Sequence, residues 1–279
     1  MDSPAPAQHA YKLGHSATEV RRLELQARYI GGFTEDILKR ARLVSGMRVL
    51  DLGCGIGDVS FLAASLVGPM GDVRGIDAAP GAIDIARQRA ASAGMTSVHF
   101  DVAGVMDFDF SNVDAIIGRL ILLHIPDPVQ LLARVASTAS PGTLVVFHEL
   151  DMSTARSVPE SPLCTKGLRL LIETFRRAGI DPDIGSKLFT LFRQAGLPDP
   201  DMLLAARIEG GPDAFAYQYL ADTLRTLMPL AQHLGIADAD SIDIDTLTTR
   251  LRDEIVSLDG VMQPPAYLGA WARVAHSRR

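Results

Sequence analysis

The sequence predicts an α/β protein built on a doubly wound, mostly parallel sheet. Three observations support this fold class. From Met47 onward apolar strand patterns alternate with helix patterns, glycine marks the turns between them, and a final apolar strand comes close to the end of the chain. Such alternation is typical of βαβ units, in which helices cover both faces of the sheet. The 279 residues, 47% of them hydrophobic, suffice for a large packed core.

Residues 1–45 predict a helical cover in front of the sheet. A capping-box pattern at residues 16–19 opens an amphipathic helix, whose apolar residues recur every three or four positions. Gly31 and Gly32 are expected to interrupt this helix, and a second helix is expected over about residues 34–43. We expect both helices to lie across the mouth of a ligand site.

Residues 46–152 predict the α/β core of the sheet. Strands are expected near residues 47–52, 73–77, 97–101, 113–117 and 143–149. Helices are expected near residues 58–67, 80–93 and 128–139. A glycine follows each of these helices, beside a proline in two cases, as expected at helix ends. Five strands joined by such segments predict parallel pairing.

Residues 153–264 predict a helical lid that includes one late strand. Helices are expected at residues 162–178, 184–195, 212–234 and 245–258, with the strand at residues 201–209. Residues 265–279 then complete the core with a final strand at residues 266–274. The late helices are therefore expected as an insertion between two strands at the edge of the sheet.

The first strand runs into a glycine-rich turn, V-L-D-L-G-C-G-I-G-D, at residues 49–58. Gly53 and Gly55 allow the backbone to turn tightly and to approach a ligand closely. A dinucleotide fingerprint needs a glycine at the sixth position, where this chain has Asp58. Asp58, together with Asp51 at the strand end, would repel a pyrophosphate. A ligand with a positively charged portion fits this turn better.

This turn resembles motif I of the class I S-adenosylmethionine-dependent methyltransferases, and the chain resembles their small-molecule type, related to quinone-biosynthesis enzymes. The resemblance implies a Rossmann-like sheet of seven strands with an antiparallel final strand. It also implies S-adenosylmethionine as the cofactor, whose sulfonium and ammonium groups suit nearby carboxylates. The implied reaction is in-line transfer of a methyl group to a small, largely apolar organic acceptor, such as a secondary metabolite or a quinone-like molecule.

Asp77 is the predicted ribose-binding acid. It ends the second strand 24 residues after Gly53, about the interval expected for an acid that accepts both ribose hydroxyls, and Ala78 follows it. The alternative is a turn residue that caps the next helix. By resemblance, Asp101 and Val102 at the end of the third strand contact the adenine; the alternative there is an ordinary strand-end turn.

The resemblance places three further residues at the cofactor. The backbone of Arg119 and Leu120, after the fourth strand, is expected to flank it. Gln26 of the N-terminal cover is expected to reach its methionine end. Substrate contacts are predicted for Tyr11, Tyr29 and Phe175, although a surface or core position is the alternative for each of them.

Three side chains are candidate general bases. His148 and Glu149 end the fifth strand, where polar residues meet the ligand crevice of such sheets. Because strand side chains alternate, at most one of the two is expected to face the substrate. A salt bridge to a lid arginine such as Arg156, or a core hydrogen bond, is the alternative. His124 is the third candidate, and a bond to the turn backbone is its alternative.

Composition excludes several classes of partner. The net charge is −6, from 27 basic and 33 acidic residues, and the sequence has no block of like charge, which argues against nucleic acid. The two cysteines do not have the sequence spacing of metal-ligating cysteines, so they suggest neither a zinc site nor a disulfide framework, and no metal is implied. With no signal peptide pattern and no apolar stretch near ~18 residues, a cytoplasmic protein without a membrane partner is expected. The N-terminal arm is compatible with a homo-oligomer.

Two other functions stay open at this point. A protein of the same fold that binds the cofactor without catalysis, as a scaffold, would keep the same motifs. An NAD(P)-dependent reductase is the second alternative, against which Asp58 and the lack of a Tyr-x-x-x-Lys pair weigh.

Overall fold

The computed structural model describes residues 17–236 and 242–275, and its centre is a seven-stranded sheet. The strand order is β3-β2-β1-β4-β5-β10-β7. Five neighbouring strands are parallel, and β10 pairs antiparallel with both β5 and β7. The predicted doubly wound, mostly parallel sheet is therefore confirmed. The strands are β1 (Arg48–Leu52), β2 (Asp72–Asp77), β3 (Val98–Val102), β4 (Ala115–Arg119), β5 (Leu144–Asp151), β7 (Asp201–Ala205) and β10 (Ala266–Arg273).

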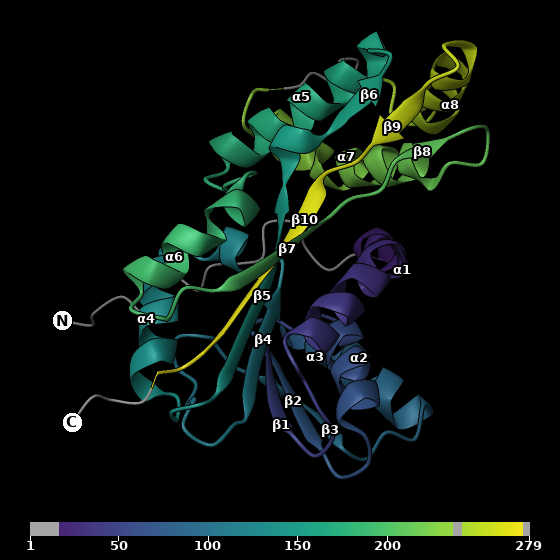
Figure 1. Cartoon of the computed structure of the whole chain (residues 1–279). Helices are drawn as coiled ribbons and strands as arrows, with labels where there is room; N and C mark the ends of the chain where they lie inside the picture. The colour runs from purple at the N-terminus through teal and green to yellow at the C-terminus, as the bar shows by residue number, and fades with distance from the viewer. Residues whose placement is uncertain (1–16, 237–241, 276–279) are drawn as a thin grey trace, which may run out of the picture.

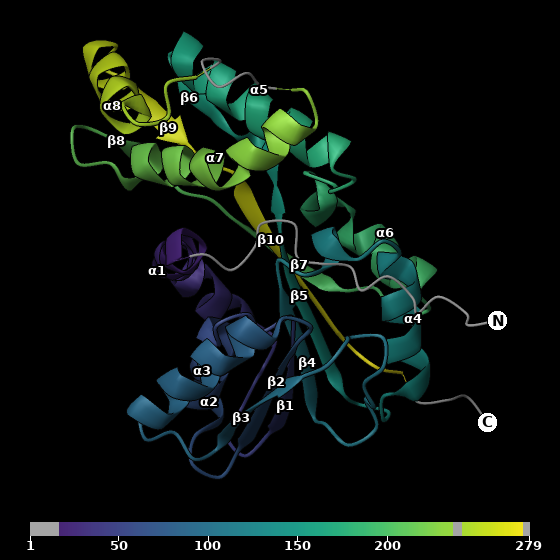
Figure 2. The same cartoon turned by 180° about the vertical axis from the view of Figure 1, so that it is seen from behind.

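Helices cover both faces of this sheet (Figures 1 and 2). On one face α1, α2 and α3 pack over a core that includes Ile83 and Ile117. On the other face α4 and α6 pack over a core that includes Leu131, Phe147 and Phe192. Burial on both faces explains why the central strands read as continuous apolar runs. The helices are α1 (Ala17–Arg40), α2 (Asp58–Val67), α3 (Pro80–Ser92), α4 (Pro128–Thr138) and α6 (Leu188–Gln194).

Helix α1 is continuous, so the predicted interruption at Gly31 and Gly32 is wrong. A Cβ added to either glycine would meet nothing within 4 Å, and neither has a left-handed backbone. Each glycine costs a helix about 1 kcal/mol relative to alanine. Buried contacts of Ile30 and Ile37 against the sheet offset that cost, since tertiary packing supplies most helical stability in proteins.

The lid lies beyond the carboxyl ends of the central strands (Figure 1). It contains α5 (Pro162–Arg177), α7 (Phe215–His233), α8 (Leu247–Ser257) and a small antiparallel sheet in the order β6-β9-β8. Its strands are β6 (Arg156–Val158), β8 (Glu209–Gly210) and β9 (Val261–Gln263). This small sheet was not predicted, because strands of two or three residues are too short to show an alternating pattern. The strand expected over residues 201–209 is in fact divided between the two sheets.

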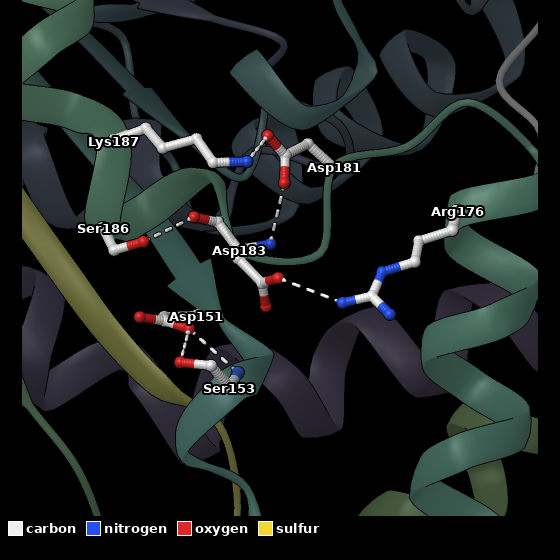
Figure 3. Close-up of polar contacts among 7 residues, drawn as sticks. All are labelled: Asp151, Ser153, Arg176, Asp181, Asp183, Ser186 and Lys187. Carbon is white, nitrogen blue, oxygen red and sulfur yellow. Dashed lines mark hydrogen bonds and ion pairs between the residues drawn. The ribbon is translucent and has the colours of Figure 1, made fainter.

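Polar side chains shape the connections between β5, α5 and the following turn (Figure 3). Asp151 accepts hydrogen bonds from the backbone N–H and the hydroxyl of Ser153, and so caps the turn η2 (Met152–Thr154). Arg176 of α5 lies 3.4 Å from the Asp183 carboxylate, just before η3 (Ile184–Lys187). Exposed pairs of this kind contribute little stability, so we assign them to turn geometry. Within the described ranges, no helix is both long and apolar enough to cross a bilayer.

Candidate functional site

The glycine-rich turn connects β1 to α2 at the carboxyl edge of the sheet. Gly53, Gly55 and Gly57 all have positive φ, a backbone conformation that residues with a Cβ adopt only at an energetic cost. A Cβ on Gly53 would lie 2.5 Å from Ile121 Cδ1, and one on Gly57 would lie 2.8 Å from Phe100 Cζ. A Cβ on Gly55 would meet nothing within 4 Å. The turn is therefore packed closely at its two ends and open at its centre.

Asp77 lies beside this open centre. Its Oδ2 accepts a hydrogen bond from the Gly55 N–H at 3.0 Å, and its Oδ1 accepts one from the Ala79 N–H at 2.9 Å. Each oxygen keeps a second lone pair, because a carboxylate has about four acceptor positions. Ala78, between the two, is exposed. The structure thus brings the predicted acid and the glycine turn together, and Asp77 also shapes the turn before α3.

The other two acids at this turn have partners within the protein. Asp51 is buried and accepts a hydrogen bond from Ser60 Oγ at 2.6 Å; burial raises its pKa to about 7. Asp58 forms an ion pair with Arg89 of α3 at 2.7 Å. Because Arg89 balances its charge, Asp58 is not the free acid that the sequence analysis assumed. Asp77 and Asp51 are therefore the carboxylates that disfavour a phosphate ligand at this turn.

A second group of polar side chains lies at the ends of β4 and β5, on the face that α1 covers. Arg119 pairs with His148 in the strand register, and its Nη1 donates to Thr34 Oγ1 at 3.3 Å. The same Thr34 oxygen lies 3.1 Å from His148 Nδ1. Burial, and then the Arg119 charge, lowers the pKa of His148 to about 3, so the ring is neutral at physiological pH. His148 Nε2 is buried without a hydrogen-bond partner.

Glu149 points to the opposite face of the sheet. Its Oε1 accepts hydrogen bonds from the N–H groups of Ile121 and Leu122, at 3.0 and 2.8 Å, and so holds the turn η1 (Leu122–His124). Burial raises its pKa to about 8. We therefore interpret Glu149 as a residue that shapes this turn rather than as the base that the sequence analysis proposed.

The N-terminal cover and the lid meet through aromatic side chains. Gln26 Nε2 donates to the Tyr219 hydroxyl at 3.3 Å, and that hydroxyl lies 2.8 Å from the hydroxyl of Tyr267. Tyr29 stacks on Tyr219 and on Phe215, with ring centroids 5.0 and 5.3 Å apart. Gln26 and Tyr29 thus join α1 to α7 across the site. The predicted contact of Tyr11 lies outside the described residues.

The remaining predicted residues have other surroundings. The Asp101 carboxylate pairs with Arg74 at 3.2 Å, and Val102 is 47% exposed at the end of β3. Phe175 is buried in the lid core, which favours the alternative reading of a packing residue. His124 lies in η1, where its backbone N–H donates to the Ile121 carbonyl. The strand register nevertheless pairs Val102 with Asp77, so the end of β3 lies beside the predicted ribose acid, whereas the contacts described above do not place Phe175 and His124 there.

Sequence reasoning missed Thr34, Tyr219 and Tyr267. Thr34 follows Gln26 by eight residues, so the two share one face of a continuous helix. The expected interruption at the glycine pair concealed this spacing. The two tyrosines come from the lid and from the last strand, and no local pattern brings them together.

The sheet order and the helices of both faces are those of Rossmann-like methyltransferase structures. A putative methyltransferase from Bacillus halodurans superposes with a TM-score of 0.56 at 14% identity, covering 87% of this chain and 99% of that one. The chain also superposes, with a TM-score of 0.55 at 16% identity, on phosphoethanolamine N-methyltransferase 2 from Haemonchus contortus. That structure is a complex with phosphomonomethylethanolamine and S-adenosylhomocysteine. It covers 88% of this chain and 53% of that one. At these identities the likeness defines the fold.

The sequence comparisons show similarity to methyltransferases over part of the chain. Residues 43–176 match the model of a methyltransferase domain family. An aklanonic acid methyltransferase of a Streptomyces species is 40% identical over 106 residues, which is 37% of this chain and 48% of the relative. A demethylmenaquinone methyltransferase of Geobacillus kaustophilus is 27% identical over 122 residues, which is 43% of this chain and 52% of that relative. The chain spans about half the length of these two relatives.

Proposed function

We propose that this chain is an S-adenosylmethionine-dependent methyltransferase that acts on a small, largely apolar organic acceptor. The observation that carries the proposal is the Asp77 carboxylate, held by the Gly55 N–H beside the open centre of the glycine turn. The names of the relatives, an aklanonic acid and a demethylmenaquinone methyltransferase, support a secondary metabolite or a quinone-like molecule as the acceptor.

The residues at the turn fit an adenosyl sulfonium ligand. Asp77 has the free lone pairs that two ribose hydroxyls need, and Gly55 leaves space above the backbone. Asp51, on the neighbouring strand, adds a carboxylate whose charged form a nearby positive charge would stabilise. When bound, S-adenosylmethionine supplies a methyl group that its sulfonium already activates.

The chain's own contribution is then mainly orientation and the exclusion of water. In favourable cases, alignment of the reactants lowers the activation free energy by about 7–11 kcal/mol. A general base typically raises the rate by roughly 10²- to 10⁴-fold. The contact of Gln26 and Tyr29 with α7 closes the site between cover and lid. A pKa near 3 makes His148 a weak base, so we propose that it orients the acceptor through Nε2. His124 stays the second candidate for contact with the acceptor.

Isothermal titration calorimetry tests this function. We expect wild-type protein to bind S-adenosylmethionine and S-adenosylhomocysteine and not NADH. Asp77→Asn should weaken both by at least about tenfold, since hydrogen bonds to a charged group contribute about 1.5–3 kcal/mol. Asp114→Asn is the matched control, because Asp114 pairs with Arg48 at the opposite end of the sheet. Binding of NADH without binding of S-adenosylhomocysteine would contradict the proposal.

Methyl transfer itself is tested with radiolabelled S-adenosylmethionine and a panel of hydroxylated aromatic and quinol acceptors. Label in an organic-soluble product is the expected result. Binding of S-adenosylhomocysteine without transfer to any member of the panel would favour the non-catalytic alternative.

A further inference from the structure

Strand β7 forms one edge of the seven-stranded sheet and pairs only with β10. The backbone N–H and C=O groups on its outer side have no hydrogen-bond partner among the residues that the structure describes. Two of its five side chains, Met202 and Leu204, are large, apolar and exposed, at 37% and 56%. An open edge of this kind is a template for pairing with another strand.

The two exposed side chains continue the hydrophobic core beyond the last covered strand. In the strand register Met202 lies opposite Ala270, and Leu204 lies opposite Leu268. Both residues of β10 are buried, and Ala270 pairs with Phe147 on the face that α6 covers. Directly opposite residues of an antiparallel pair share one face of the sheet. Met202 and Leu204 therefore extend this apolar face to the edge of the sheet, where both keep more than a third of their surface exposed.

The other edge strand of the same sheet, β3, carries polar side chains at its exposed positions. His99 and Asp101 are 53% and 47% exposed, and they lie 3.3 and 3.2 Å from Asp72 and Arg74 of β2. Charged side chains on an edge strand oppose pairing with a second chain, because that pairing would bury them. In β7 only the first residue is charged. The two edges therefore differ in how readily they can accept a further strand.

The sequence of β7 is complementary to a second copy of itself. When two copies pair antiparallel over all five residues, the two-fold axis passes beside Leu203 and residue 202 of one copy lies opposite residue 204 of the other. Met202 then packs against Leu204 of the second copy at both symmetry-related positions. Asp201 lies opposite Ala205, so this register brings no two like charges directly together.

The charges beyond the two ends of the strand fit the same register. Asp199 before the strand and Arg207 after it are 67% and 42% exposed. Antiparallel pairing brings the end with Asp199 beside the end with Arg207 of the second copy, whereas parallel pairing would bring Asp199 beside Asp199. Within its own chain Asp199 lies 3.4 Å from Arg193, and Arg207 lies 3.6 Å from Glu209. Exposed pairs of this kind are weak, so they leave both charges available to a second chain.

We propose that two copies of this chain associate through β7, so that their sheets join into one continuous sheet about a two-fold axis beside Leu203. The inference does not depend on the proposed methyl transfer. In strand addition the backbone hydrogen bonds supply affinity, and the side chains on one face supply specificity. A contact confined to one short strand is small, so we expect a weak dimer with a Kd roughly in the micromolar range.

Sedimentation velocity of the full chain, over about a hundredfold range of concentration, measures this association. We expect the wild type to pass from monomer to dimer. Met202→Lys and Leu204→Asp should each raise the Kd of the dimer at least about tenfold, because each places a charge opposite an apolar side chain of the second copy. Met70→Lys is the matched control, since Met70 is 82% exposed between α2 and β2 and should leave the Kd unchanged. Circular dichroism checks that all variants fold.

A mixture of the two β7 variants tests the register. In a mixed dimer the new lysine at position 202 lies opposite the new aspartate at position 204, while the unchanged Leu204 and Met202 lie opposite each other. The mixture should therefore associate at least about threefold more tightly than either variant alone, since opposite charges in directly opposite positions stabilise a strand pair. Native mass spectrometry identifies the mixed dimer by its mass. A mixture that associates no better than its components refutes the two-fold register.

Three other results would overturn the proposal. One is a wild type that stays monomeric at the highest concentration. Another is a dimer that neither β7 variant weakens, which would place the contact elsewhere, as in the N-terminal arm. Hydrogen exchange provides the third, because the amides of residues 201–205 should gain protection as the protein concentration rises. Protection that does not depend on concentration would mean that a segment of the same chain covers this edge.

Discussion

Glu149→Gln should remove a loss of stability that the wild-type protein shows as the pH rises. The Glu149 carboxyl group is fully buried, and its pKa is about 8 in the fold against an ordinary value of 4.5. The folded chain therefore holds a proton that the unfolded chain releases. A group of this kind stabilises the fold below its unfolded pKa, and the contribution is lost as the pH rises through the folded pKa.

The magnitude follows from the same two values. Between about pH 5.5 and pH 8.5 the wild type should lose about 3 kcal/mol of unfolding free energy that the glutamine variant keeps. Glutamine retains the oxygen that accepts the hydrogen bonds of Ile121 and Leu122, so the turn should persist. Asp51, whose pKa is about 7, titrates in both proteins and cancels in the difference between them.

Urea unfolding at several pH values, followed by circular dichroism, measures this difference. Glu173→Gln is the matched control, because it makes the same substitution at a carboxylate that is 52% exposed on α5. If the wild type and Glu149→Gln show the same pH dependence, Glu149 is ionised in the folded protein and the reasoning fails.

Three further substitutions test the packing around the site by urea unfolding. Gly53→Ala should destabilise the fold by about 1–3 kcal/mol, because the new Cβ would lie 2.5 Å from Ile121 Cδ1 at a positive φ; an unchanged midpoint would refute this contact. Gly32→Ala should stabilise α1 by about 0.5–1 kcal/mol, since the helix is continuous and the position is open, and destabilisation would argue for a break. Tyr219→Phe should cost about 1–2 kcal/mol by removing the hydroxyl between Gln26 and Tyr267, and an unaffected free energy of unfolding would show that this bridge is weak.

The sheet was predictable because its signals are local. Each core strand carries its own apolar run, and the glycines that follow set where the chain turns, as at Gly53. The antiparallel final strand followed from a family resemblance. The small lid sheet was not predictable, because a strand of two residues such as β8 is too short to show an alternating pattern. The glycine pair in α1 led to the wrong prediction of a helix break, because packing there outweighs the low helix propensity of glycine.

The site was predictable where one strand end defines it. Asp77 could be placed from its interval to the glycine turn, and it lies beside Gly55 as that interval suggested. The roles of Asp58 and Glu149 could not be read in this way. Asp58 meets Arg89, which comes 31 residues later, and Glu149 meets a turn of another strand. Contacts of this kind depend on side-chain direction across elements, and no spacing in the sequence encodes them.

The way in which the segment between β7 and β10 joins the sheet has a consequence for how such proteins diversify. Its two ends are anchored at facing positions, since Ala205 of β7 pairs with Tyr267 of β10. A segment that leaves the sheet and rejoins it at adjacent positions can be exchanged by recombination without altering the order of the strands. We expect chimeras that carry the corresponding segment of a relative to fold on this scaffold, with a different selectivity for the molecule that is modified.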